Sequence, residues 1–231
     1  MDFRSDNVAG VAPQILEAVI AANRGTASSY GADDISARVE ARLCEIFERE
    51  VRAFPVATGT AANALSLSVM TPPYGAILCH DEAHIHFDEC GAPEMFTGGA
   101  KLVPLPGASG KLTPDTVRHI LENTLTGDAH RVQPSALSIT QATEAGTCYR
   151  PAEVAALAEV ARSRGMKVQM DGARFANAVA HLGVSPAEVT WRSGVDALAF
   201  GGTKNGALGA ELVGFFDTTL ADTFGFRRKR A

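Results

Sequence analysis

The sequence has no excess of positive charge, because 26 aspartates and glutamates outnumber 21 lysines and arginines and leave a net charge of −5. Nucleic-acid binding needs a basic face, and only the tail at residues 227–230 is basic, so we expect no nucleic-acid partner. No uninterrupted apolar run reaches the length that spans a bilayer, so we expect no membrane association. Composition excludes these classes and says nothing about chemistry.

Cysteine is scarce, with four in 231 residues and no C-x-x-C pair among them. A chain of this length with so few cysteines is not a small disulfide-stapled domain, and a reduced setting suits it. Its first residues lack the basic and then apolar pattern of a signal peptide, so we expect a cytoplasmic location. The hydrophobic content of 46% is enough to bury a sizeable core in one large α/β domain or two small ones.

Strand-like and helix-like segments alternate along the chain, which predicts βαβ units and a mostly parallel sheet with helices on both faces. Pro55 weakens the first of the strands, since proline cannot donate to a sheet ladder. Either Asp33 or Asp34 can cap the second helix. Strands are expected at 51–56, 76–79, 101–105, 135–141, 166–170, 195–200 and 211–216. Helices are expected at 13–22, 35–47, 58–70, 114–125 and 151–164, between the strands at 166–170 and 195–200, and from 217 onward.

The stretch Phe-Gly-Gly-Thr-Lys-Asn-Gly at 200–206 follows an apolar run that is typical of a buried strand. Glycines there let the backbone approach a bulky group closely. Lys204 would lie at the carboxyl end of a strand, where open α/β sheets bind ligands. A lysine buried in this way can form a Schiff base with a carbonyl, although a solvated lysine on a surface loop explains the stretch about equally well.

Asp171 favours the Schiff-base interpretation of Lys204 over the surface loop, because it ends the preceding strand-like run and is followed by Gly172. An isolated Asp-Gly pair is usually a turn. An aspartate and a lysine at neighbouring strand ends suit pyridoxal 5′-phosphate (PLP), since the lysine holds the aldehyde and the aspartate keeps the pyridine nitrogen protonated. The pair therefore predicts a PLP site.

Gly59 and Thr60 open a helix, where free backbone N–H groups form an anion site that suits a phosphate. An ordinary cap by Thr58 or Thr60 is the alternative. Three histidines and four carboxylates at residues 80–89 suggest a metal cluster, but the segment has no H-E-x-x-H spacing. We expect no metal there, and we expect the segment to be a strand end followed by a loop.

These residues resemble the PLP-dependent threonine aldolases of the β-eliminating lyase group, which have the aspartate aminotransferase-like fold (fold type I). The resemblance runs from Phe-Arg-Ser-Asp-Asn at 3–7 to the last residues. The stretch at 200–206 and Ile-Thr-Gln-Ala-Thr-Glu at 139–144 match the branch that cleaves phenylserine-like and threonine-like amino acids. The resemblance implies an α/β large domain of fold type I and a PLP-dependent lyase.

The resemblance also assigns roles to single residues. It implies that the ring of His84 stacks on the PLP pyridine and can assist proton transfer from the substrate hydroxyl. The implied catalytic residues are Lys204, His84 and Asp171; the implied cofactor-binding residues are Gly59, Thr60, His84, Asp171, Arg174, Thr203 and Lys204; and the implied substrate-binding residues are Ser5, Tyr30 and Arg174.

The resemblance divides the chain into an N-terminal segment at 1–32 and a PLP-binding large domain at 33–231. The family continues into a small C-terminal domain that this sequence does not contain, and that domain usually supplies a second arginine for the substrate carboxylate. Many threonine aldolases also carry Glu-Asn-Thr-His after the fourth expected strand, and this chain has no histidine there. Glu144 or His84 must then act as the base.

The implied reaction is cleavage of a β-hydroxy-α-amino acid of the threonine, allo-threonine or phenylserine type to glycine and an aldehyde. Another PLP-dependent β-eliminating lyase, a racemase, a transaminase, or a truncated PLP-binding domain without turnover are the alternatives. Family members build their sites at subunit interfaces, so we expect a homodimer or homotetramer.

Overall fold

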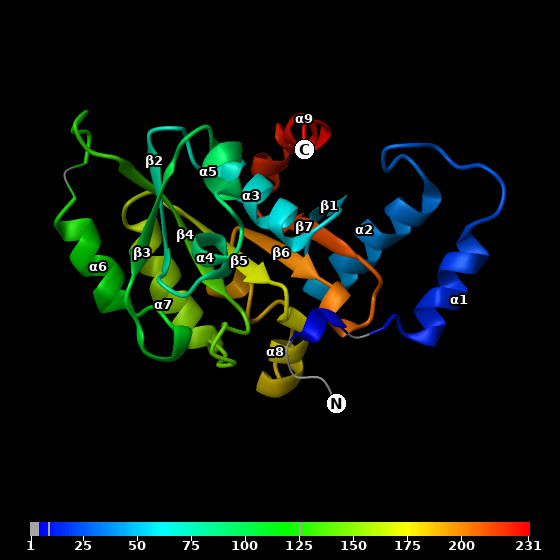
Figure 1. Ribbon diagram of the computed structural model, residues 1–231. Coiled ribbons are helices and arrows are strands. Elements are labelled where there is room, and N and C mark those ends of the chain that lie inside the picture. Colours follow the sequence, from blue (N-terminus) through cyan, green and yellow to red (C-terminus); the bar gives the residue numbers. More distant parts are fainter. Residues whose placement is uncertain (1–4, 9, 125) are drawn as a thin grey trace.

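The computed structural model describes residues 5–8, 10–124 and 126–231. Within these residues, seven strands form one sheet in the order β1-β7-β6-β5-β4-β2-β3 (Figure 1). The strands are β1 (Arg52–Val56), β2 (Gly75–His80), β3 (Lys101–Leu105), β4 (Gln133–Thr140), β5 (Lys167–Gly172), β6 (Ala197–Gly201) and β7 (Glu211–Phe215). The helices are α1 (Pro13–Ala22), α2 (Asp34–Phe47), α3 (Gly59–Met70), α4 (His84–Phe87), α5 (Ala92–Thr97), α6 (Pro114–Glu122), α7 (Pro151–Arg162), α8 (Phe175–Leu182) and α9 (Phe224–Lys229).

The sheet is parallel from β3 through β2, β4 and β5 to β6, and antiparallel where β7 joins β6 and β1. The expected mostly parallel sheet is therefore confirmed. Asp171 pairs with Thr140 on β4 and with Ala199 on β6, so the carboxyl ends of these three strands lie side by side. This edge is where parallel sheets bind ligands.

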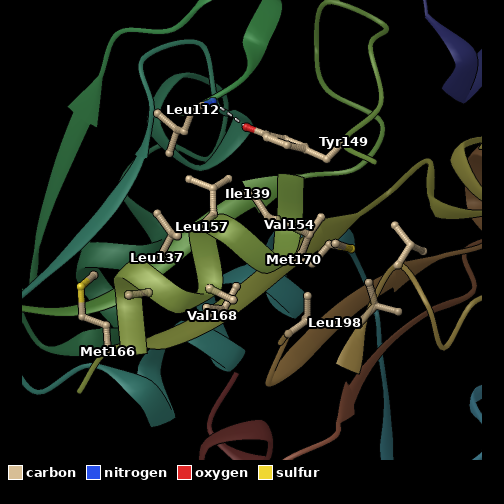
Figure 2. Packing of buried hydrophobic residues seen from close by; sticks show 14 of the residues in the cluster. Leu112, Leu137, Ile139, Tyr149, Val154, Leu157, Met166, Val168, Met170 and Leu198 are labelled. Carbon is tan, nitrogen blue, oxygen red and sulfur yellow. Dashed lines mark hydrogen bonds between the residues drawn. The ribbon is translucent and has the colours of Figure 1, made fainter. Parts of the chain in front are cut away.

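Two apolar clusters cover the two faces of the sheet. One includes buried side chains of α2, α6, α7 and α8, and the other includes those of α3 and α9. Figure 2 shows Val154 and Leu157 of α7 packing on Leu137, Val168 and Leu198 of three neighbouring strands. Truncating one such buried leucine to alanine typically costs about 2–5 kcal/mol.

A buried hydrogen bond closes one end of the first cluster (Figure 2). The ring of Tyr149 is 1% exposed, and its hydroxyl accepts a hydrogen bond of 2.7 Å from the backbone N–H of Leu112. Burial raises the pKa of Tyr149 well above its usual range, so the phenol remains neutral. The hydroxyl thus satisfies a backbone donor that has no access to water.

Helix α1 lies apart from the sheet (Figure 1). The sequence predicts this helix and its apolar face, yet the four side chains of that face are exposed: Ile15, Leu16, Val19 and Ile20. A backbone hydrogen bond of 3.0 Å from the N–H of Ala12 to the carbonyl of Gly206 ties the start of α1 to the loop that carries Lys204. No helix in the described part of the chain combines the length and apolarity needed to cross a membrane.

Two expected segments differ from the structure. The helix expected from residue 217 is wrong, because Asp217 accepts a hydrogen bond from the N–H of Thr219 and closes a 3-10 turn, Thr218–Ala221, before α9 begins. The loop expected after His80 instead contains α4, a single helical turn. Buried Ala83 and Ile85 hold this turn against α3. Of the two predicted caps of α2, Asp33 is the one that caps it, accepting from the N–H of Ser36.

Candidate functional site

A cavity of about 310 Å³ lies at the carboxyl ends of β4, β5 and β6, next to the first turn of α3. Most of the side chains that the sequence predicts for a site lie along it, although they come from distant parts of the chain. The lining includes Asn7, Thr58, Gly59, Thr60, Asn63, His84, Glu89, Thr140, Glu144, Asp171, Arg174, Thr203, Lys204 and Glu211.

Lys204 lies in a 3-10 turn, Thr203–Asn205, directly after β6. Its side chain is 14% exposed, and its Nζ lies 3.8 Å from Asp6 Oδ1. Gly206 ends the turn in a left-handed conformation (φ +81°), and a Cβ on Gly201 would lie 2.8 Å from the Cα of Ala173. These two glycines therefore allow the tight turn and the close strand approach that hold the amine in the cavity.

Asp171 is 4% exposed at the end of β5. Its Oδ1 accepts a hydrogen bond of 3.0 Å from the N–H of Ala173, and its Oδ2 accepts one of 2.8 Å from Nδ2 of Asn63. A buried carboxylate whose two oxygens are held in place by these donors is well suited to pair with a protonated ring nitrogen.

The first turn of α3 presents free backbone donors. Thr58 is the N-cap, and its Oγ1 accepts from the N–H of Ala61 at 3.0 Å. The N–H groups of Gly59 and Thr60 have no hydrogen-bond partner among the described residues. The cap and the anion site are therefore compatible: the threonine satisfies one amide, and two others remain for an anion at the positive end of the helix dipole.

His84 opens α4, and its Nδ1 lies 2.9 Å from Oε1 of Glu89. The hydrogen bond that His84 donates to Glu89 raises the pKa of His84, although burial opposes the shift. His80 is buried, with its Nε2 2.9 Å from the carbonyl oxygen of Gly107, and His86 is exposed. Among the described residues, no group of three or more His, Cys, Asp or Glu side chains is arranged to hold a metal ion.

Glu144, one of the two candidate bases, lies close to His84. Its Oε1 accepts hydrogen bonds from the backbone N–H of His84 at 2.9 Å and from the hydroxyl of Thr140 at 3.0 Å. The carboxylate thus lines the cavity within reach of the other candidate. The loop after β4 therefore brings an acid to the place where many threonine aldolases are expected to have a histidine.

Arg174 lies just past the end of β5 and forms a forked ion pair with Asp6. Its Nε lies 2.6 Å from Oδ2, and its Nη2 lies 3.2 Å from Oδ1. Burial acts to raise the pKa of Asp6, but the hydrogen bonds and charge of Arg174 outweigh it and lower the pKa. Asn7 lines the cavity beside this pair, whereas Ser5 is exposed and its Oγ accepts from the N–H of Asn7.

Two other predicted residues lie in different environments. Thr203 lines the cavity, where it hydrogen-bonds to Glu211, and burial raises the pKa of Glu211 against those hydrogen bonds. Tyr30 is 77% exposed and is not part of the cavity lining, and Lys229 Nζ lies 4.1 Å from the centre of its ring. Its predicted contact with substrate stays a prediction.

Four residues of the site were missed from the sequence: Asp6, Asn63, Glu89 and Glu211. Asn63 carried the clearest signal, because it is a polar residue one helical turn after Gly59 in a helix whose other inward residues are small or apolar. Glu89 was seen only as one of several acids in a charged segment. Asp6 and Glu211 join the site through contacts that no local pattern encodes.

The donor set of the cavity fits PLP. A nearly buried amine suits the aldehyde, two free N–H groups at a helix N-terminus suit the phosphate, and a buried carboxylate suits the pyridine nitrogen. All three line one cavity. The side chain of Glu89 is fully buried and its Oε2 has no hydrogen-bond partner among the described residues.

Comparison with known proteins also points to a PLP-dependent lyase. The model of the family described as Beta-eliminating lyase matches residues 2–229. A low specificity L-threonine aldolase of Pseudomonas aeruginosa is 44% identical over 229 residues, which cover 99% of this chain and 66% of that protein. The alanine racemase TOXG of Cochliobolus carbonum is 33% identical over 183 residues, or 78% of this chain and 45% of that protein.

A solved structure of Leishmania major threonine aldolase superposes with a TM-score of 0.91 at 26% identity, covering 98% of this chain and 65% of that chain. Aminotransferases of known structure share the architecture too, so the expected fold type I is confirmed. The chain spans just under two thirds of the length of the aldolases it matches. The match of the family model over nearly all of the sequence shows that the chain belongs to the Beta-eliminating lyase family.

Proposed function

We propose that this chain carries the PLP site of an aldolase that cleaves β-hydroxy-α-amino acids to glycine and an aldehyde. The observation that carries the proposal is the meeting of Lys204, Asp171 and the free N–H groups of α3 in one cavity. The 44% identity to a low specificity L-threonine aldolase supports the choice of reaction. Threonine, allo-threonine and phenylserine are the proposed substrate types.

The residues divide the work of holding the cofactor. Lys204 would bond to the aldehyde, Gly59 and Thr60 would hold the phosphate through their N–H groups, and Asp171 would pair with the ring nitrogen. Bound PLP supplies an electron sink for the pair released when the Cα–Cβ bond breaks. Thr203 and Arg174 remain proposed cofactor neighbours beside these groups.

His84 is the proposed group that takes the proton from the substrate hydroxyl, with Glu144 as the alternative. Arg174 would bind the substrate carboxylate. Its Nε and Nη2 are engaged by Asp6, which leaves Nη1 without a partner among the described residues. Asp6 therefore fixes the plane of the guanidinium and directs its remaining edge, and Ser5 is the proposed second contact.

Borohydride reduction of the PLP-loaded protein, followed by peptide mapping, tests the role of Lys204. A label on Lys204 is expected, and a label on any other lysine would contradict the proposal. Asp171→Asn should keep the fold and lose most of the turnover, because a neutral amide does not hold the pyridinium proton. Turnover like that of the unchanged protein would remove Asp171 from the mechanism.

Aldehyde release from phenylserine and threonine tests the reaction. The resemblance implies a second carboxylate-binding arginine in the family's C-terminal domain, and one charge-assisted contact is worth about 1.5–3 kcal/mol. A version extended with that domain should therefore have a kcat/KM roughly ten- to a hundred-fold higher than this chain. Equal values would show that residues 1–231 already hold the substrate fully, and no aldehyde from either version would exclude an aldolase.

Racemisation is the second candidate, favoured by the 33% identity to an alanine racemase. The same electron sink serves racemisation, β-elimination and transamination, so the fold does not choose among them. Product analysis separates them, because only the aldolase releases glycine. A homodimer or homotetramer and a cytoplasmic location are proposed from the family resemblance, and light scattering that shows a monomer at micromolar concentration would contradict the first.

A further inference from the structure

Glu89 is a carboxylic acid with no exposed side-chain surface at the wall of the cavity. Its Oε1 receives two hydrogen bonds, from Nδ2 of Asn63 at 2.8 Å and from Nδ1 of His84 at 2.9 Å, while its Oε2 is buried without a partner among the described residues. Burying an ionisable group costs free energy unless it is paired. The position of Glu89 therefore calls for a function that an apolar residue could not supply.

Asn63 joins Glu89 to Asp171. Its Nδ2 also donates to Oδ2 of Asp171 at 2.8 Å, so one amide nitrogen uses its two hydrogens on two carboxylates. A second hydrogen bond fixes the orientation of this amide, because Oδ1 of Asn63 accepts from Nε2 of Gln169 at 2.9 Å. Oε1 of Gln169 in turn accepts from the hydroxyl of Ser138 at 2.6 Å. The two acids are thus held in a rigid frame.

The charges around His84 come from four directions. Glu89 contacts its ring, Glu144 accepts from its backbone N–H, Asp171 adds negative charge from β5, and Lys204 adds positive charge from the turn after β6. Glu89 has the largest influence on the pKa of His84, which is raised. Burial raises the pKa of Glu89 itself, against the hydrogen bonds from His84 and Asn63.

We propose that Glu89 is a positioning residue that fixes the proton on Nδ1 of His84, so that Nε2 is the nitrogen that exchanges protons in the cavity. The importance of this tautomer for the reaction rests on the proposed function. Both hydrogen bonds of Glu89, from Nδ2 of Asn63 and with Nδ1 of His84, reach Oε1, and a proton on Glu89 would occupy Oε2, which has no partner among the described residues. Oε1 is therefore an acceptor, and Nδ1 of His84 carries the proton. The frame of Asn63 and Gln169 prevents Glu89 from turning away, and it ties the placement of His84 to that of Asp171.

The test is an NMR titration of His84 in this 231-residue chain, without and with PLP, in the unchanged protein and in Glu89→Gln. Asp88→Asn is the matched control, because it removes an exposed carboxylate from the neighbouring position. An opposite charge in contact typically shifts a pKa by about 1–3 units. The pKa of His84 should therefore fall by about one unit or more in Glu89→Gln and stay unchanged in Asp88→Asn. No fall in Glu89→Gln, or an equal fall in both variants, would overturn the proposal.

Two further measurements keep the proposal open to refutation if Glu89→Gln does not fold. In the unchanged protein, the ring nitrogen chemical shifts of neutral His84 should show Nδ1 protonated, and a protonated Nε2 would overturn the assignment. Glu89→Asp keeps the charge, so it should retain the raised pKa of His84, and a pKa like that of a free histidine would count against the carboxylate. Neither readout depends on turnover, so the role of Glu89 is tested separately from the aldolase activity.

Discussion

Replacing Asn63 with alanine removes the amide that bridges two buried carboxylates. Asn63 is 2% exposed, and three side-chain hydrogen bonds join it to Glu89, Asp171 and Gln169. Two of these acceptors are acids, whose burial is tolerated only while they are hydrogen-bonded. Among the described residues, the change therefore leaves Glu89 with only the hydrogen bond from His84. It leaves Asp171 with only the hydrogen bond from the backbone N–H of Ala173.

The expected loss follows from those contacts. A hydrogen bond to a charged group contributes about 1.5–3 kcal/mol, and Asn63 donates two such bonds, to Glu89 and Asp171. We therefore expect Asn63→Ala to lower the free energy of unfolding by about 3–5 kcal/mol. For a domain of this size, each kcal/mol lowers Tm by about 2–4 °C, so Tm should fall by roughly 6–20 °C.

Urea denaturation followed by circular dichroism measures this loss. Ser68→Ala is the control in the same helix, because Ser68 is also buried but, in the part of the chain that the structure describes, its hydroxyl donates only to the carbonyl of Leu65 within α3. The control should lose about 1 kcal/mol or less. If Asn63→Ala lost no more than Ser68→Ala, the bridging of the two carboxylates by Asn63 would not stabilise the fold, and the reasoning would fail.

Tyr149→Phe should lower the free energy of unfolding by about 1–3 kcal/mol, since the buried N–H of Leu112 loses its acceptor; an unchanged urea midpoint would contradict this. Burial raises the pKa of Glu153, but the hydrogen bonds that Arg150 and Lys111 donate to it together lower that pKa by more. Its pKa is therefore lowered from 4.5 to about 2. Its stabilising contribution is present above pH 4.5 and is lost as the pH falls toward 2. Glu153→Gln should therefore cost about 1 kcal/mol at neutral pH and nothing near pH 2, since solvent screens this partly exposed group; a loss that did not depend on pH would refute it.

Local signals were enough to predict the residues at the strand ends. Lys204 and Asp171 each follow an apolar run and are next to glycine or a small residue, so their place in the fold is encoded within a few residues of sequence. Gly59 and Thr60 are encoded in the same way by the start of a helix. The alternation of segments predicted the mostly parallel sheet for the same reason, because each strand and helix carries its own periodicity.

Local sequence patterns could not predict the contacts between segments that are far apart in the chain. Asn63 meets Asp171 across 108 residues, and Arg174 meets Asp6 across 168 residues. The reversal of β7 was not predicted either, because an apolar run has the same pattern in either direction. The turn of α4, which places His84, depends on the burial of Ile85 against a helix from another part of the chain.

The pairing of β1 with β7 has a consequence for how the protein is made. Strand β1 lies at one edge of the sheet beside β7, which comes last along the chain among the strands of the described residues, and α3 follows β1 closely. On the ribosome, the first turn of α3 therefore cannot reach its place beside Lys204 until residues 211–215 have left the exit tunnel. Pairing between segments so far apart in the sequence is slow, because closing the long loop between them costs conformational entropy before any stabilising contact forms. The cavity is thus completed only after residues 211–215 have emerged, and shorter nascent chains have no formed site with which to capture a ligand.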